Sequence, residues 1–253
     1  MTVSSPSSTH PLWPALAAAR DVALEAVAET LWPTRCVLCD APGATLCPRC
    51  AQTLPYIDAL TACSRCGAPH GAVQCTECNP VMLEGAGYEA FPLDAAVSAV
   101  LLTARTRRIV TTFKDQGERR LAHDMAAIVA RYLPPQWLAE DCAISYVPAT
   151  AAARRRRGFD HAELLARELS WHASCEYAPL LRAPHHRDQR KLSRHERALN
   201  AARSMEVLPG ASVPSRLVVV DDVCTTGATL YAAATALRAA GAATVFGATF
   251  ARA

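Results

Sequence analysis

Four Cys-x2-Cys pairs constrain what this chain can fold into more than any other feature of its sequence. They hold eight of the eleven cysteines, as Cys36/Cys39, Cys47/Cys50, Cys63/Cys66 and Cys75/Cys78. The other three (Cys142, Cys175 and Cys224) are scattered, which is not the pattern of a secreted disulfide domain. Two thiolates on one tight turn are typical of metal ligation in a reducing compartment, so we expect a cytoplasmic protein.

The spacing of these pairs predicts two closed structural zinc sites. Two such turns complete the tetrahedral shell of Zn²⁺, and an all-cysteine shell leaves no position for a catalytic water. A redox dithiol or an iron–sulfur cluster is the alternative, but four pairs and this ligand set favour zinc. Sequential pairing of the ligands is the simplest arrangement, and an interleaved arrangement would use the same residues. Zinc binding contributes about 10 kcal/mol or more per site, which lets a short segment fold.

Composition limits the remaining classes of protein. The chain has 253 residues, 51% of them hydrophobic, which is enough for one α/β core and a small satellite module. Its net charge of +3 excludes a polycation, so any basic surface must be local. No apolar run reaches the ~18 residues of a membrane-spanning helix, and the N-terminus lacks the basic and apolar regions of a signal peptide.

Helix and strand patterns alternate in the second part of the chain. One or two helical turns are expected from Pro11, broken near Pro14 and followed by a helix to about Thr30. Further helices are expected at 93–107, 118–132, 161–172 and 228–240, with Asp160 as an N-cap and Gly241 as a stop. Strands are expected at 142–147, 177–182, 216–220 and 244–250. This order predicts an α/β fold with a mainly parallel sheet flanked by helices. The expected domains are a tail and helix at 1–33, a double zinc ribbon at 34–82 and an α/β domain at 86–253.

A polar segment follows the strand expected at 216–220 and leads into a helix. It reads Asp221-Asp222-Val223-Cys224-Thr225-Thr226-Gly227-Ala228-Thr229. Threonine hydroxyls, a glycine and the N–H groups of a helix N-terminus bind phosphate. The two acids are poor phosphate ligands but suit ribose hydroxyls, directly or through Mg²⁺. The segment is neither a Walker loop nor a GxGxxG turn, and an ordinary acidic turn would not need the whole string, so it predicts a sugar 5-phosphate site.

The segment resembles the signature of the type I phosphoribosyltransferases, and nearly the whole chain resembles the ComF/GntX family. Three further segments carry this resemblance: Phe113-Lys114-Asp115-x-Gly117, Val147-Pro148 followed by Arg157-Gly158-Phe159-Asp160-His161, and Arg190, Leu192, Arg197 and Asn200. Arg190-Lys191 departs from the family, which usually has a Thr-Gln pair there.

The resemblance implies a type I phosphoribosyltransferase fold that binds 5-phosphoribosyl 1-diphosphate with Mg²⁺. Pyrophosphate would be displaced by a nitrogen acceptor that the sequence does not identify. Asp221 and Asp222 would hold the ribose diol, and residues 223–229 would hold the 5-phosphate. Lys114, Arg157, Gly158 and Arg197 would lie on the diphosphate side.

Two basic segments keep a second function open. Arg154 to Arg157 form a four-arginine run, and residues 185–203 are rich in arginine and histidine. The second segment suits either a lid over the diphosphate or a nucleic-acid-binding arm. The alternative is therefore a non-catalytic protein whose partners are single-stranded DNA or the DNA-uptake machinery of competent bacteria, a role that the family resemblance implies.

Overall fold

The computed structural model describes residues 33–139, 141–183 and 205–253. The helix expected after Pro14 and ending near Thr30, and the basic segment 185–203 with Arg197, lie outside the described residues.

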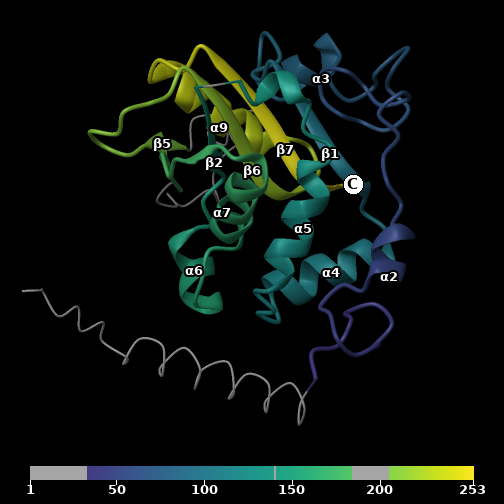
Figure 1. Cartoon of the computed structure of the whole chain (residues 1–253). Coiled ribbons are helices and arrows are strands. Elements are labelled where there is room, and N and C mark those ends of the chain that lie inside the picture. Colours follow the sequence, from purple (N-terminus) through teal and green to yellow (C-terminus); the bar gives the residue numbers. More distant parts are fainter. Residues whose placement is uncertain (1–32, 140, 184–204) are drawn as a thin grey trace, which may run out of the picture.

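A five-stranded parallel sheet, in the order β1-β7-β6-β2-β3, forms the centre of the fold (Figure 1). Its strands are β1 (Ala95–Leu101), β2 (Cys142–Tyr146), β3 (Glu176–Tyr177), β6 (Arg216–Cys224) and β7 (Thr244–Arg252). The short strands β4 (Leu181–Arg182) and β5 (Glu206–Val207) form a separate antiparallel pair. The predicted mainly parallel sheet is confirmed.

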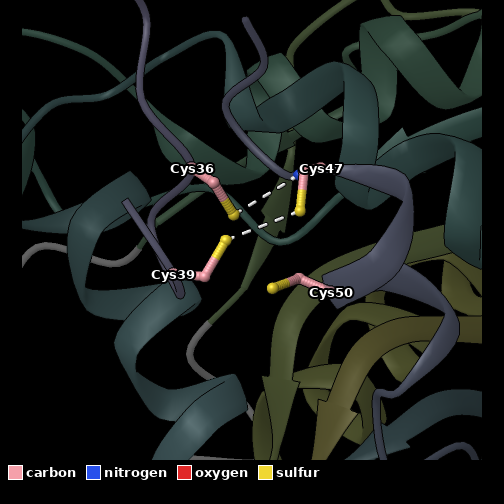
Figure 2. A group of neighbouring side chains, drawn as sticks. All are labelled: Cys36, Cys39, Cys47 and Cys50. Carbon is pink, nitrogen blue, oxygen red and sulfur yellow. Dashed lines mark hydrogen bonds between the residues drawn. The ribbon is translucent and has the colours of Figure 1, made fainter. Parts of the chain in front are cut away.

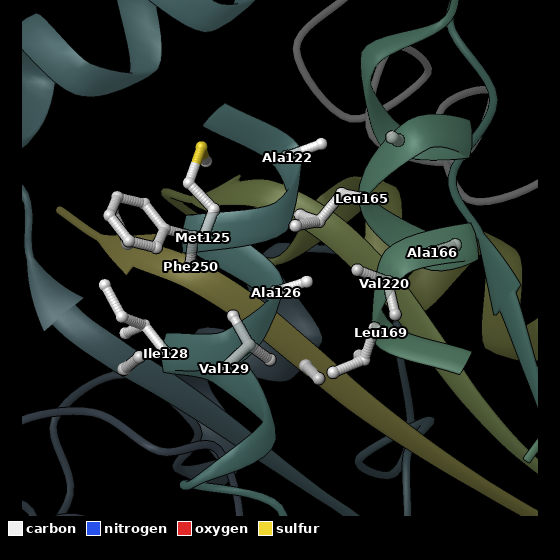
Figure 3. Close-up of a cluster of buried hydrophobic side chains, with 14 of the residues drawn as sticks. Ala122, Met125, Ala126, Ile128, Val129, Leu165, Ala166, Leu169, Val220 and Phe250 are labelled. Atoms are coloured by element: carbon white, nitrogen blue, oxygen red, sulfur yellow. The ribbon is translucent and has the colours of Figure 1, made fainter. Parts of the chain in front are cut away.

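Helices cover both faces of the sheet because its central strands are apolar on both sides. On one face, α4 (Ala104–Lys114), α5 (Leu121–Ala130) and α7 (His161–Ala173) pack on Val218, Val220 and Phe250. Figure 3 shows α5 and α7 with Val220 and Phe250 in this layer. On the other face, α9 (Ala228–Ala239) packs on Leu217 and Val219. The other helices in the described part of the chain are α2 (Pro48–Gln52), α3 (Pro80–Gly85), α6 (Ala151–Arg157) and the 3₁₀ turn η1 (Pro135–Trp137).

Several elements confirm the sequence-based predictions. The helices expected at 118–132, 161–172 and 228–240 are α5, α7 and α9, and the strand expected at 142–147 is β2. Asp160 is the N-cap of α7, where its carboxylate accepts from the N–H groups of Ala162 and Glu163. Gly241 follows α9 with a φ of 107°, a conformation that favours glycine.

The helix expected at 93–107 is wrong. Residues 95–101 form β1, and α4 begins only at Ala104. Alanine favours helix locally, but β1 is paired along its length with β7 and largely buried, so the tertiary contact decides its conformation. The single strand expected at 177–182 is also wrong, because these residues divide between β3 and β4, which belong to different sheets.

The cysteine-rich segment packs along the outer edge of β1. Ile57 N–H donates to the Ala99 carbonyl at 3.0 Å, and Leu101 N–H donates to the Pro55 carbonyl at 2.8 Å. Further along, Ala96 N–H donates to Arg65 at 2.7 Å. The module thus covers backbone groups that an open edge strand would expose. Within the described ranges, no helix has the length and apolarity needed to cross a membrane.

Candidate functional site

The first cysteine cluster brings together Cys36, Cys39, Cys47 and Cys50, whose sulfurs converge in Figure 2. The sulfurs of Cys39 and Cys47 are 3.6 Å apart. A tetrahedron with Zn–S bonds of about 2.3 Å has sulfurs about 3.8 Å apart, so the group fits zinc. Burial raises the pKa of the Cys36 thiol, but N–H groups of Cys47, Cys39 and Leu38 outweigh it and bring the pKa to about 6.

The second cluster comprises Cys63, Cys66, Cys75 and Cys78. Its sulfurs lie 3.7 Å apart for Cys63 and Cys78 and 3.5 Å apart for Cys66 and Cys75. The N–H of Glu77 also points at the Cys75 sulfur, at 3.4 Å. Both clusters therefore fit structural zinc, and the ligands pair sequentially rather than in the interleaved arrangement.

The predicted phosphate loop joins β6 to α9. Thr225 and Thr226 are exposed, and Gly227 caps the first turn of α9 with a φ of 77°. A Cβ at Gly227 would lie 2.6 Å from Cζ of Tyr231, so both the backbone and the packing require glycine. Free N–H groups at the start of a helix attract anions, and two hydroxyls stand beside them here.

Asp221 lies within β6 and not in the loop, because the strand continues to Cys224. Its carboxylate accepts from the Asp222 N–H at 2.8 Å and from the Thr229 hydroxyl at 3.2 Å. Burial, and then the charge of Asp222, raise the pKa of Asp221 well above its usual value. Asp221 therefore retains a proton at a pH where an exposed carboxyl is ionised.

Asp222 is the ionised member of the pair. Lys114 Nζ lies 3.0 and 3.1 Å from its two oxygens, and His161 Nε2 lies 3.6 Å from Oδ1. Burial opposes the charge, but the hydrogen bonds and charges of His161 and Lys114 outweigh it and lower the pKa of Asp222. The C-terminus of α4 and the N-terminus of α7 thus meet at the end of β6.

Arg157 extends this network toward the surface. Its guanidinium lies 3.1 Å from the Asp115 carboxylate and 3.4 Å from Nδ1 of His161. Gly158 ends α6 with a φ of 77°. The other three arginines of the run, at 154–156, are exposed, whereas the side chain of Arg157 is only 11% exposed. The structure therefore places Lys114 on Asp222 and joins Arg157 to Asp222 through His161, whereas no contact links Gly158 to the acids within the described residues.

Arg252, at the end of β7, connects the second cysteine cluster to the phosphate loop. Its guanidinium donates to the Cys66 carbonyl at 2.8 Å and contacts the Cys224 sulfur at 3.3 Å. It also pairs with Glu77, whose Oε2 lies 3.1 Å from Nε. Arg252 is 3% exposed, so this guanidinium is a buried bridge between the two sites.

No role was predicted from the sequence for His161, Tyr231 or Arg252. His161 follows the predicted N-cap Asp160 and lies four residues after Arg157, so the helical spacing was a usable signal. Tyr231 likewise lies four residues after Gly227 on α9. The contacts of Arg252 span 186 positions in the sequence, and no local pattern indicates them.

The comparisons with known proteins support a zinc ribbon in the cysteine-rich segment. They give a weaker match for the α/β part of the chain. Residues 27–80 match the double zinc ribbon domain family. None of the curated proteins matches the chain significantly. The similar solved structures include an orotate phosphoribosyltransferase from Aeropyrum pernix, with a TM-score of 0.33 and 20% identity over 58% of this chain and 76% of that one. The fold described above rests on the sheet order and the helices themselves.

Proposed function

We propose that the chain binds 5-phosphoribosyl 1-diphosphate with Mg²⁺ and transfers its phosphoribosyl group to a nitrogen acceptor. One observation carries this proposal. Exposed Thr225 and Thr226 and the left-handed Gly227 lie at the N-terminus of α9, directly after the two acids of β6. The family resemblance of the sequence agrees with this site.

Each part of the site has a role in the proposed reaction. The loop N–H groups and the threonine hydroxyls bind the 5-phosphate and fix the position of the sugar. Asp221 and Asp222 accept from the ribose hydroxyls. Lys114 and Arg157 attract the diphosphate, which leaves with the electron pair of the C1–O bond while the acceptor nitrogen bonds to C1 and loses a proton.

The carboxyl oxygens of the two acids suit the preference of Mg²⁺ for oxygen ligands, and the charge of a bound cation would favour release of the proton that Asp221 retains. Asp221 and Asp222, together with oxygens of the ligand, would hold the ion, which supplies positive charge to the leaving diphosphate. The ammonium group of Lys114 is paired with the Asp222 carboxylate in this structure. This ion pair must open before a cation or a ribose hydroxyl can bind to the carboxylate. Lys114 is 27% exposed at its side chain and can turn toward a diphosphate instead.

Calorimetry with 5-phosphoribosyl 1-diphosphate, with and without Mg²⁺, tests the binding. Thr226→Val should weaken it about 10- to 100-fold, since a hydrogen bond to a charged group contributes about 1.5–3 kcal/mol. Thr235→Val is the matched control, because Thr235 lies on the same helix and donates to the Tyr231 carbonyl. Absence of binding by the wild type, or an equal effect of the two variants, contradicts the proposal.

Pyrophosphate release tests the transfer step separately. The zinc-loaded protein is incubated with the ligand, Mg²⁺ and a panel of nucleobases and amines. Release that depends on one acceptor and is lost in Asp222→Asn supports a transferase. Binding without release on any acceptor contradicts transfer and leaves a ligand sensor.

A second candidate function has its own observation. The exposed arginines at 154–156 lie on α6, and two of them, Arg154 and Arg155, line a surface hollow of about 530 Å³ with Phe159. Guanidinium groups beside an aromatic ring suit single-stranded nucleic acid. Binding of a labelled oligonucleotide should fall as salt rises and should weaken when arginines 154–156 become glutamine. Unchanged binding in that variant excludes this surface as the contact.

A further inference from the structure

Two histidines and a glutamate meet on the outer side of the α5–α7 pair. His123 lies on α5, and Glu168 and His172 lie one turn apart on α7. His123 Nδ1 is 3.0 Å from Glu168 Oε2, and the two imidazole rings are 4.9 Å apart at their centroids. One ligand atom from each of the three residues lies within 4.8 Å of the others.

The buried faces of α5 and α7 pack against each other and fix the positions of these three residues. Ala122 and Ala126 of α5 face Leu165 and Leu169 of α7 in the buried layer (Figure 3). Small side chains on one helix and large ones on the other let the helices approach closely. The positions of His123, Glu168 and His172 are therefore set by two packed helices and not by a loop.

The donor set is that of a transition-metal site with an open position. Two imidazoles and one carboxylate are a common zinc ligand set in which water takes the fourth place. Bonds of about 2.0–2.1 Å place tetrahedral ligands about 3.3 Å apart, so no pair of ligand atoms, all within 4.8 Å of one another, has to close by more than about 1.5 Å. The side chains of His123 and Glu168 are 56% and 39% exposed, which leaves their torsions free to do so.

His172 is the residue that an ordinary ion pair does not explain. A pair between His123 and Glu168 would need no third member. Nε2 of His172 is buried and lacks a hydrogen-bond partner among the described residues.

We propose that His123, Glu168 and His172 form a third, exchangeable Zn²⁺ site that joins α5 to α7. It differs from the two cysteine clusters in its nitrogen and oxygen ligands and in its exposure to solvent. Zinc bound there would exchange with the medium, while zinc in the cysteine clusters stays in place.

Equilibrium dialysis of the full chain against Zn²⁺, starting with both cysteine clusters loaded, measures this site. The wild type should take up one further equivalent per chain. Glu168→Gln and His172→Ala should each weaken that uptake about tenfold or more, the scale on which even loss of an outer-shell partner weakens metal sites. Glu163→Gln is the matched control, because Glu163 lies on the same helix and pairs with Arg167.

Thermal unfolding supplies a second readout. Added Zn²⁺ should raise the unfolding midpoint of the wild type and of Glu163→Gln, because an ion that binds only the folded chain stabilises it. The midpoint of Glu168→Gln should not respond. The proposal is overturned if the wild type stops at two equivalents, or if Glu168→Gln and His172→Ala bind a third equivalent as the wild type does.

Discussion

Replacing Arg252 with methionine removes the buried bridge between the second cysteine cluster and the phosphate loop. The change leaves the buried Cys66 carbonyl without its 2.8 Å donor, which costs about 2 kcal/mol. Loss of the pair with Glu77 adds only about 0.5 kcal/mol, because the Glu77 side chain is 37% exposed and water replaces the partner. Loss of the Cys224 contact adds a similar ~0.5 kcal/mol. The total is about 3 kcal/mol, or about 6–12 °C in the unfolding midpoint.

Calorimetry of the zinc-loaded protein measures this change, and Arg182→Met is its control. Arg182 also pairs with a glutamate, Glu206, but the two side chains are 50% and 57% exposed, so its loss should cost about 0–1 kcal/mol. A chelating dye should also take one of the two zinc ions faster from Arg252→Met than from the wild type. Equal midpoints for the two variants would refute the reasoning, because the buried bridge would then contribute no more than a surface pair.

Three other predictions follow from the site. Gly227→Ala should lower both the unfolding midpoint and the affinity for phosphate, because the added methyl group clashes with Tyr231 and the residue keeps a positive φ. Gly210→Ala is the control, since Gly210 has a φ of 75° but no described atom lies within 4 Å of the added Cβ. Calorimetry should show a cost of only about 1–2 kcal/mol for that control. Asp221 has a raised pKa, so its contribution to stability is present below a pH of about 4 and is lost as the pH rises through its folded value; Asp221→Asn should therefore gain stability over the wild type at pH 8, measured by denaturant unfolding. Removing zinc with a strong chelator should unfold residues 34–82, visible as loss of amide-exchange protection there, and protection that persists without metal would exclude a structural role.

Local patterns in the sequence predicted the parts of the fold that local chemistry determines. The Cys-x2-Cys spacing identifies ligands because each pair needs only one turn of backbone. The helix α7 begins after its N-cap Asp160, and the helix α9 ends just before Gly241. Both of these signals lie next to the helix that they bound. Each of these features lies within a few residues of its partner, so a reader of the sequence sees both members.

Long-range partners determined what the sequence could not show. The strand expected to end at Val220 continues to Cys224 because β7 supplies partners as far as Arg252. The two acids therefore lie inside a strand and are buried, although a polar segment after a hydrophobic run favours a loop. In the same way, Ala95–Leu101 forms a strand because β7 pairs with one of its edges and the cysteine-rich segment bonds to the other.

The position of β7 between β1 and β6 also fixes the order in which the molecule can assemble during synthesis. The hydroxyl of Ser98 in β1 bonds to that of Thr249 in β7, which lies 151 positions later in the sequence. The carbonyl of Cys66 accepts from Arg252, which lies 186 positions later. A ribosome that adds about 5–20 residues per second makes Arg252 roughly 10–40 s after Cys66. The zinc knuckles can load metal during that interval, because their ligands are already made. The sheet cannot close until β7 is made, so the zinc ribbon can take up its metal before Arg252 is available to bond to it.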